Sequence, residues 1–515
     1  MTTIEPRLAA FSSRRTIGPR AGALIVSIGA LLIGLAAGES GIVVIAALAG
    51  ALGAIAIALR PDRATLVVVA ILYSNAAAIA VQQHGVPYIV GAALPLLLVV
   101  PFAYHLIIRR QEVVVTHGLR FMFGYFFVLL LGTLFGMSAD PARAMDAFVT
   151  FIVEGLLVYV VVTNVVRTLE DLRRIVWVLL LVGGFLGILS VYQQATETYG
   201  NDYLGFAKVS QATLNTGTGA DAGGQPRLAG PIGEKNRYAQ IMIVLIPLGL
   251  FRIWDERRLV FRAAAVAATT LIAFGAALTF SRGAALGFAI MLAVMVILRY
   301  IKLSQLIGIA LGISLVLVTQ PTYADRLLTL DALEGATTQK GATLVEDASI
   351  RKRANETIAA LLVFADHPIL GVGRGLFPVY YLDYGAEVGI ASENDARQAH
   401  NLYAGIAAET GIFGFVTFFG IFLVTLIDLN VVRRRWRARA PAYANMATAF
   451  TLAIVAYLTT GLFLHLAYER FLWLLLALAG SAAYVGLKAQ DSLEEPAASV
   501  TVPVERSSLR AQPGR

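Results

Sequence analysis

Residues 402–427 read LYAGIAAETGIFGFVTFFGIFLVTLI, and this run points to the fold class. Glu409 is its single charged side chain, and an α-helix needs only about 20 mostly apolar residues to cross a bilayer. Lipid offers no hydrogen-bond partners to open backbone groups, so such a run crosses the membrane as a helix. The run therefore predicts a membrane-spanning α-helix.

The whole chain has the composition of a membrane protein. Of its 515 residues, 58% are hydrophobic and 14% are charged, and the mean hydropathy is +0.73. About a quarter of a typical soluble domain is charged, which argues against a soluble protein. The absence of cysteine excludes disulfides, thiolate metal sites and a cysteine nucleophile. The net charge is +8, but the arginines cluster between apolar runs, which indicates topology signals rather than nucleic-acid binding.

Many other runs are long and apolar enough to cross a membrane. The fold expected is an all-α polytopic helical bundle of about 12–14 transmembrane helices, counted against the length that a span needs. The candidates lie near 22–38, 41–59, 64–81, 87–108, 119–137, 146–166, 175–192, 237–254, 259–280, 283–300, 303–320, 402–427, 442–465 and 470–487. The first run continues into further spans and no small-residue cleavage pattern follows it, so no cleaved signal peptide is expected.

The arginine clusters predict an orientation, because short cytoplasmic loops carry an excess of Lys and Arg. If the N-terminal arm is cytoplasmic, the clusters between spans fall inside, up to the run at 433–437. Both termini are therefore expected inside. The expected parts are a cytoplasmic basic arm (1–21), N-terminal spans (22–192), an external glycine-rich loop (193–236), central spans (237–320), a large external loop (321–401), C-terminal spans (402–487) and a disordered cytoplasmic tail (488–515).

The two external segments are too long to be turns. The glycine-rich one, 193–236, is expected to be a flexible linker, although its glycines could also cradle a phosphate. In the larger one, residues 348–365 are expected to form an amphipathic helix that begins just after Glu346-Asp347. The stretch Asp366-His-Pro-Ile-Leu-Gly-Val-Gly373 is expected to end this helix, because proline and glycine interrupt helices.

Three ionisable residues at the external ends of expected elements are candidates for chemistry. Arg282 begins a spanning helix, Arg353 lies in the loop helix, and His400 lies where the large loop enters a span. Singly they have ordinary explanations: a snorkelling arginine, a solvated basic face and a hydrogen-bonded histidine. On one face of the membrane, two arginines suit a diphosphate leaving group. The histidine suits proton removal from an attacking hydroxyl.

Four motifs in order resemble those of the O-antigen ligase and Wzy-type polymerase superfamily, over about residues 180–475. They are Arg227-x-x-Gly230 with Asn236, then Thr279-Phe-Ser-Arg-Gly283, then Arg353 followed fourteen residues later by His367-Pro-Ile-Leu-Gly-Val-Gly373, and finally His400-Asn401 followed after nine residues by Gly411-Ile-Phe-Gly414. The sequence departs from the family in having more expected helices than is common and in carrying Thr357 where a tryptophan is frequent.

The resemblance implies a GT-C-like glycosyltransferase of the bacterial inner membrane that uses no metal or other cofactor. Its implied partners are an undecaprenyl-diphosphate-linked glycan donor, a glycan or lipid A-core acceptor, and membrane lipids, but no nucleic acid. It implies that Arg282 and Arg353 bind the diphosphate and that His400 acts as the base or positions the acceptor. The implied substrate-binding residues are Arg227, Asn236, Asn401, Gly411 and Gly414. Neither His367 nor His400 has a clustered carboxylate partner at metal-ligand spacing in the sequence, although folding of the loop could supply one.

The motifs leave the acceptor open. It can be a lipid A-core sugar (a ligase), the growing glycan (a polymerase) or a protein hydroxyl, and ligase-type transfer is favoured. A rival of another class is a transporter or flippase of lipid-linked saccharides. That rival predicts charges buried through the full bilayer depth and paired broken helices, whereas the charges of this sequence gather at the external face.

Overall fold

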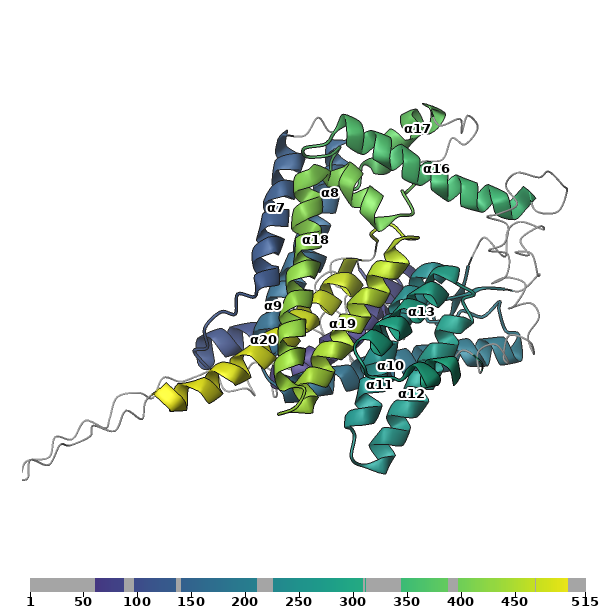
Figure 1. The fold of residues 1–515 in the computed structure, drawn as a ribbon. Helices are drawn as coiled ribbons and strands as arrows, with labels where there is room; N and C mark the ends of the chain where they lie inside the picture. The colour runs from purple at the N-terminus through teal and green to yellow at the C-terminus, as the bar shows by residue number, and fades with distance from the viewer. Residues whose placement is uncertain are drawn as a thin grey trace, which may run out of the picture.

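The computed structural model describes residues 61–87, 97–135, 140–210, 226–308, 311, 344–387, 397–467 and 469–498. Within these ranges the protein is a bundle of long helices with one short β-hairpin (Figure 1). Eight of the described helices are long and apolar enough to cross a membrane, or nine if one bent pair forms a single span. This confirms a polytopic helical membrane protein. The arm 1–21, the expected spans 22–38 and 41–59, and most of 303–320 lie outside the described residues.

The expected span 64–81 is a broken one. Helices α3 (Pro61–Tyr73) and α4 (Ala76–Gln83) meet at an angle of 57°. Asn75 lies between them in the left-handed region, with φ of 62°, a conformation that asparagine tolerates better than most residues. Its side-chain nitrogen donates to the carbonyl of Pro231 at 2.9 Å, which fixes the bend against a distant segment.

Three further candidate spans and one shorter apolar helix, Val99–Ile108, complete the described N-terminal half and lead to the hairpin. The elements are α6 (Val99–Ala103), the π-helical segment η2 (Tyr104–Ile108), α7 (His117–Phe135), α8 (Pro141–Thr150), the π-helical segment η3 (Phe151–Leu157), α9 (Val158–Val165) and α10 (Leu169–Thr196). Elements α8, η3 and α9 form one continuous span. Thr168 caps α10 by accepting from the amide of Asp171 at 3.1 Å.

The segment 193–236 holds more structure than the expected flexible linker. Strands β1 (Lys208–Val209) and β2 (Leu228–Gly230) pair antiparallel, and β2 is fully buried. Gly230 has φ of 53°, and a Cβ there would lie 2.5 Å from the ring of Tyr238, so glycine is required at this close approach. Residues 211–225, which hold the glycine run, lie outside the described residues.

The C-terminal half supplies the central spans and the large loop. Its helices are α11 (Lys235–Asp255), α12 (Leu259–Ala277), α13 (Arg282–Ile297), α16 (Leu344–Asp366), α17 (Phe377–Glu387), α18 (Leu402–Trp436), α19 (Pro441–Gly461) and α20 (Glu469–Ala498). Helices α16 and α17 lie across one end of the bundle, which we call the loop end, while α18 runs from there beside α7 (Figure 1).

Helix α16 confirms the predicted loop helix, and its packing differs from a simple amphipathic pattern. Its buried face carries Ala359, Ala360 and Val363, which pack in a small core with α17 and the start of α18. Its other face exposes apolar side chains, Ile358 and Leu361. Small side chains on α16 therefore allow its backbone to pack close to α17 and the start of α18.

Candidate active site

His400 is held by a buried carboxylate at the loop end. Its Nδ1 lies 2.8 Å from Oε2 of Glu356 and 3.1 Å from the carbonyl of Gln398. The Glu356 side chain is 1% exposed, whereas that of His400 is 35% exposed. Arg397 Nη1 lies 3.6 Å from the other carboxylate oxygen. No carboxylate lies near His400 at metal-ligand spacing in the sequence, and folding supplies one from 44 positions away.

The backbone at this point is unusual. His400 has φ of 41°, in the left-handed region that side chains other than glycine and asparagine seldom adopt. The next residue, Asn401, caps α18, since its Oδ1 accepts from the amides of Tyr403 at 2.9 Å and Ala404 at 3.1 Å. The imidazole thus projects from a turn that the first residues of α18 fix in place.

Arg353 lies one helical turn from Glu356. Residues three apart on an α-helix are neighbours on one face, so its guanidinium starts from the face that carries the partner of His400. Arg353 is half-buried, and the hydroxyl of Thr357 donates back to its carbonyl at 2.9 Å. The structure thus brings two of the three predicted catalytic residues to the contact between α16 and α18.

Arg282 approaches from the other side of the bundle. It is the first residue of α13, which Ser281 caps. At the next residue, Gly283, a Cβ would lie 3.1 Å from the ring of Phe463 in the turn after α19. That turn also carries His465, whose ring lies 5.6 Å from the ring of His400, centroid to centroid, at 80°. The turn after α19 therefore lies beside the start of α13 through Phe463 and beside His400 through His465.

Arg227 connects two of the predicted motifs. It is buried, and its guanidinium donates to the carbonyls of Thr279 at 2.9 Å and Phe280 at 2.8 Å. Phe280 has φ of 53°, so these bonds hold an unusual turn just before Arg282. Asn236 is the second residue of α11, and its backbone amide donates to the Glu234 carboxylate. Arg227 therefore stabilises the turn that immediately precedes Arg282. Its expected contact with substrate stays a prediction.

Of the two glycines of the fourth motif, Gly411 lies against the loop backbone, and Gly414 lies against Thr410 of its own helix. Gly411 interrupts α18 with φ of 63° and ψ of −166°, and a Cβ there would lie 2.2 Å from the Ile369 carbonyl oxygen. The Ile412 amide donates to the Pro368 carbonyl at 2.8 Å. A Cβ on Gly414 would lie 2.1 Å from Thr410 Oγ1. These contacts explain the glycines without a ligand, and their expected role in binding substrate is untested.

A buried ion cluster lies close to Gly411 in the chain, because one of its members is Glu409. Arg374 donates from Nη1 to Glu409 and from Nη2 to Glu469, each at 2.7 Å, and the three side chains are between 7% and 9% exposed. Burial opposes the charge on Arg374, but the nearby Glu469, Tyr125 and Glu409 raise its pKa above the usual value. The sequence analysis did not identify Arg374, although Glu409, alone as a charge in the 402–427 run, was a usable signal.

His465 lies between this ion cluster and His400. Burial lowers the pKa of His465 well below its usual value, and the positive charges of Arg237, His400 and Arg374 lower it further. Arg237 also donates to the His465 carbonyl at 2.5 Å. A small cavity runs between these groups and is lined in part by Arg374, Gln398, Gly405, Glu409, His465 and Leu466.

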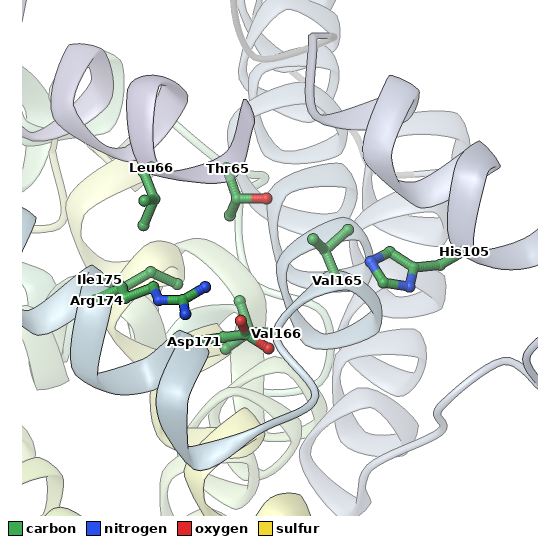
Figure 2. A pocket seen from close by; sticks show the side chains of 8 residues that line it. All are labelled: Thr65, Leu66, His105, Val165, Val166, Asp171, Arg174 and Ile175. Atoms are coloured by element: carbon green, nitrogen blue, oxygen red, sulfur yellow. The ribbon is translucent and has the colours of Figure 1, made fainter. Parts of the chain in front are cut away.

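A second cavity, of about 170 Å³, lies at the opposite end of α3 from Asn75. Figure 2 shows Thr65 and Leu66 of α3 facing Asp171 and Arg174 of α10, with His105 beside Val165. It contains none of the predicted site residues, so the loop end remains the candidate active site. Within the described ranges, no group of three or more His, Asp or Glu side chains is arranged to hold a metal ion.

The comparison with known families agrees with this location. Residues 267–419 match the family model described as O-Antigen ligase, and the matched segment includes Arg282, Arg353 and His400. Arg227 and Asn236 precede it. No curated protein matches the chain. Residues 267–419 are therefore similar to the O-antigen ligase family, whose members are membrane enzymes that transfer glycans.

Proposed function

We propose that this protein transfers a glycan from an undecaprenyl-diphosphate-linked donor to an acceptor hydroxyl at the external face of a bacterial inner membrane. The contact between His400 and Glu356 carries the proposal, because it places a proton acceptor where the large loop meets the membrane bundle. Arg353 lies one helical turn away, and the turn after α19 lies beside both His400 and the start of α13, which carries Arg282. All four residues lie in the segment that matches the O-antigen ligase family.

The reaction uses these residues as follows. The acceptor oxygen forms a bond to the anomeric carbon, and the bond from that carbon to the diphosphate oxygen breaks. The leaving diphosphate takes the bonding electron pair, and Arg282 and Arg353 bind its negative charge. His400 accepts the proton of the acceptor hydroxyl at Nε2, because Nδ1 is engaged by Glu356. No step requires a redox partner.

The proposed orientation follows from α18. His400 lies two residues before this helix, and the basic run 433–437 lies at its other end. Beyond the break at Gly411, α18 continues for 25 residues to Trp436, which at 1.5 Å per residue is roughly 38 Å and exceeds the bilayer core of about 30 Å. Positive charge favours the cytoplasmic side, so the loop end faces outward and both termini face the cytoplasm.

Cysteine labelling tests this orientation in a chain that has no cysteine of its own. Single cysteines replace the exposed Asp383 in α17 and the exposed Ala438 beyond α18. An impermeant thiol reagent added to intact cells should label the first and spare the second. Equal labelling of both positions contradicts the orientation.

A transporter of lipid-linked saccharides is the alternative from another class, and the broken helices are the observation in its favour. However, protein fills both breaks. Asn75 bonds to Pro231 at the α3–α4 bend, and Ile369 occupies the space beside Gly411. Neither break is open to a saccharide, so the transferase function is supported better.

The deciding experiment is reconstitution. Purified protein in lipid nanodiscs is incubated with a synthetic undecaprenyl-diphosphate oligosaccharide and, separately, with a lipid A-core acceptor, excess glycan or a hydroxyl-bearing peptide. We expect an acceptor-linked product, with the lipid A-core acceptor favoured, and loss of product with the variant His400→Gln. Donor movement across proteoliposomes without any product overturns the proposal.

A further inference from the structure

We propose that Glu356 is a positioning residue that fixes the ring of His400 with Nδ1 protonated and Nε2 free to accept a proton. The inference rests on the proposed function for its role in glycan transfer, while the pairing itself can be tested without transfer. It adds a residue that lies outside the four sequence motifs.

The first step is the fixed position of the carboxylate. Glu356 is 1% exposed and lies on the face of α16 that carries Ala359 and Ala360, both fully buried. These alanines pack in one core with Ala399 and Ala404, which flank His400 in the chain. Close packing of small residues on both sides leaves the carboxylate no path to solvent. A buried carboxylate is costly unless it is bonded, so its partners are structurally required.

The second step is the tautomer. The two recorded contacts of His400 Nδ1 are to a Glu356 oxygen and to the Gln398 carbonyl, and an ionised carboxylate and a carbonyl only accept hydrogen bonds. Nδ1 therefore carries the hydrogen in neutral His400. The lone pair then resides on Nε2, on the opposite side of the ring, and this nitrogen faces the proton to be removed.

The third step is the charge around the ring. Glu356 from α16 and His465 from the turn before α20 face His400, while Arg397 from the loop lies against Glu356. Arg237 and Arg374 act on His465, and Arg374 is itself paired with the carboxylates of Glu409 and Glu469. Glu356 is the anion in direct contact with the ring, and a contacting anion favours the protonated form of a histidine. Removing the charge of Glu356 should make His400 a weaker base.

The sign of the expected change follows from this. A general base makes the rate rise with pH over the range in which it loses its proton, and removing a contacting anion makes that loss easier. Glu356→Gln keeps the size of the side chain but removes the charge, so the rising limb should move to lower pH. The amide can also donate to Nδ1, which selects the wrong tautomer. We expect a rate about 10-fold lower, a smaller loss than the roughly 10²–10⁴-fold that removal of the general base itself costs.

The experiment combines kinetics with a direct titration. Initial rates at saturating donor and acceptor are measured against pH for wild type, Glu356→Gln and Glu356→Asp, with Asp383→Asn as the control for loss of an exposed carboxylate. In parallel, NMR of ring-labelled histidine follows the titration of His400 without substrate. Arg397→Gln is a second variant that leaves Glu356 intact, and it should move both measurements to higher pH.

The outcomes separate the two proposals. A slower Glu356→Gln enzyme with its limb and its His400 titration moved to lower pH supports the pairing, as does partial recovery in Glu356→Asp. An unchanged limb and an unchanged titration overturn it, even if the yield of folded protein falls. If wild type makes no product, the proposed function fails, and the titration alone still decides whether Glu356 controls His400.

Discussion

Two carboxylate clusters lie at the loop end, and they differ in what their cation can do. Glu356 pairs with His400, a partly exposed imidazole, and imidazole is a group that can accept and release a proton. Glu409 and Glu469 pair with Arg374, which is buried and keeps its charge at any pH the protein meets. The first cluster can take part in proton transfer, whereas the second can only hold structure.

Both clusters fasten the large loop to the bundle. The His400 pair joins α16 to the start of α18, and the Arg374 cluster joins the segment after α16 to α18 and α20. The loop is therefore held to the bundle by the ion pairs of Arg374 and by the contact between His400 and Glu356. A buried pair of opposite charges is therefore not by itself evidence of a catalytic site. Whether the pair can take part in proton transfer depends on whether its cation is a histidine or an arginine.

The largest effect should come from Arg374→Gln, which leaves Glu409 and Glu469 buried without their cation. Breaking a buried ion pair by removing one partner costs about 3–5 kcal/mol, so the yield and melting temperature of the purified protein should fall sharply. Fluorescence-detected thermal unfolding in detergent measures the change. Arg435→Gln, at an exposed position near the other end of α18, serves as the control. If Arg374→Gln melts at the wild-type temperature, the Arg374 cluster does not stabilise the fold.

His400→Gln should have the next largest effect, and on rate rather than on folding. The loss of a general base costs about 10²–10⁴-fold, while the donor should still bind. Melting temperature, donor affinity and initial rate are measured on the same preparation. The rising limb of wild-type rate, expected at roughly pH 6–7 for a histidine, should be absent in the variant. Near-normal turnover would show that His400 does no chemistry.

Lysine substitution of the two arginines should give an intermediate loss. Arg282→Lys and Arg353→Lys keep the charge but lose the planar fork that grips two phosphate oxygens. We expect a cost of about 1–3 kcal/mol, or roughly 5–150-fold in rate, for each. Arg351→Lys, two residues from Arg353 and so on another side of α16, is the matched control. Equal behaviour of Arg351→Lys and Arg353→Lys would reduce Arg353 to part of a solvated basic face.

The smallest effect is expected at His367, a second loop histidine for which the described part of the chain offers no charged partner. Its ring meets that of Tyr380 edge to face, with centroids 5.9 Å apart. Such a pair stabilises by about 0.5–1.5 kcal/mol beyond its buried area, so His367→Gln should lower the melting temperature slightly and leave the rate per folded molecule unchanged. A change in the pH dependence of rate in this variant would show that the two histidines are not distinct in function.

Local signals in the sequence were sufficient for most helices. The acidic pair 346–347 and the stretch that begins at Asp366 placed a helix over 348–365, and α16 spans Leu344–Asp366. The run 402–427 forms most of α18, which extends further, to Trp436. Hydropathy identifies only the apolar part of this helix, whereas arginines are also favourable in the last turn of a helix. The bend at Asn75 was not predicted, because it depends on a bond to Pro231 in the hairpin.

The candidate site was predicted less completely, because its partners come from distant parts of the chain. Arg282, Arg353 and His400 stood out as charges near the ends of expected elements. Glu356 and Arg374 did not, since a carboxylate three residues after Arg353 and an arginine beside two glycines are ordinary in a polar loop. Only the fold shows that one touches His400 and that the other bridges two spans.

The left-handed backbone at His400 has a consequence for protein engineering. A residue other than glycine in this conformation costs on the order of 1–3 kcal/mol, and glycine adopts it freely. Stability and activity are therefore opposed at one position, a trade-off common where function requires an unfavourable local geometry. A search for heat-resistant variants scored on melting temperature alone would favour glycine here and discard the imidazole. Any thermostabilised form of this protein should be selected with residue 400 held constant.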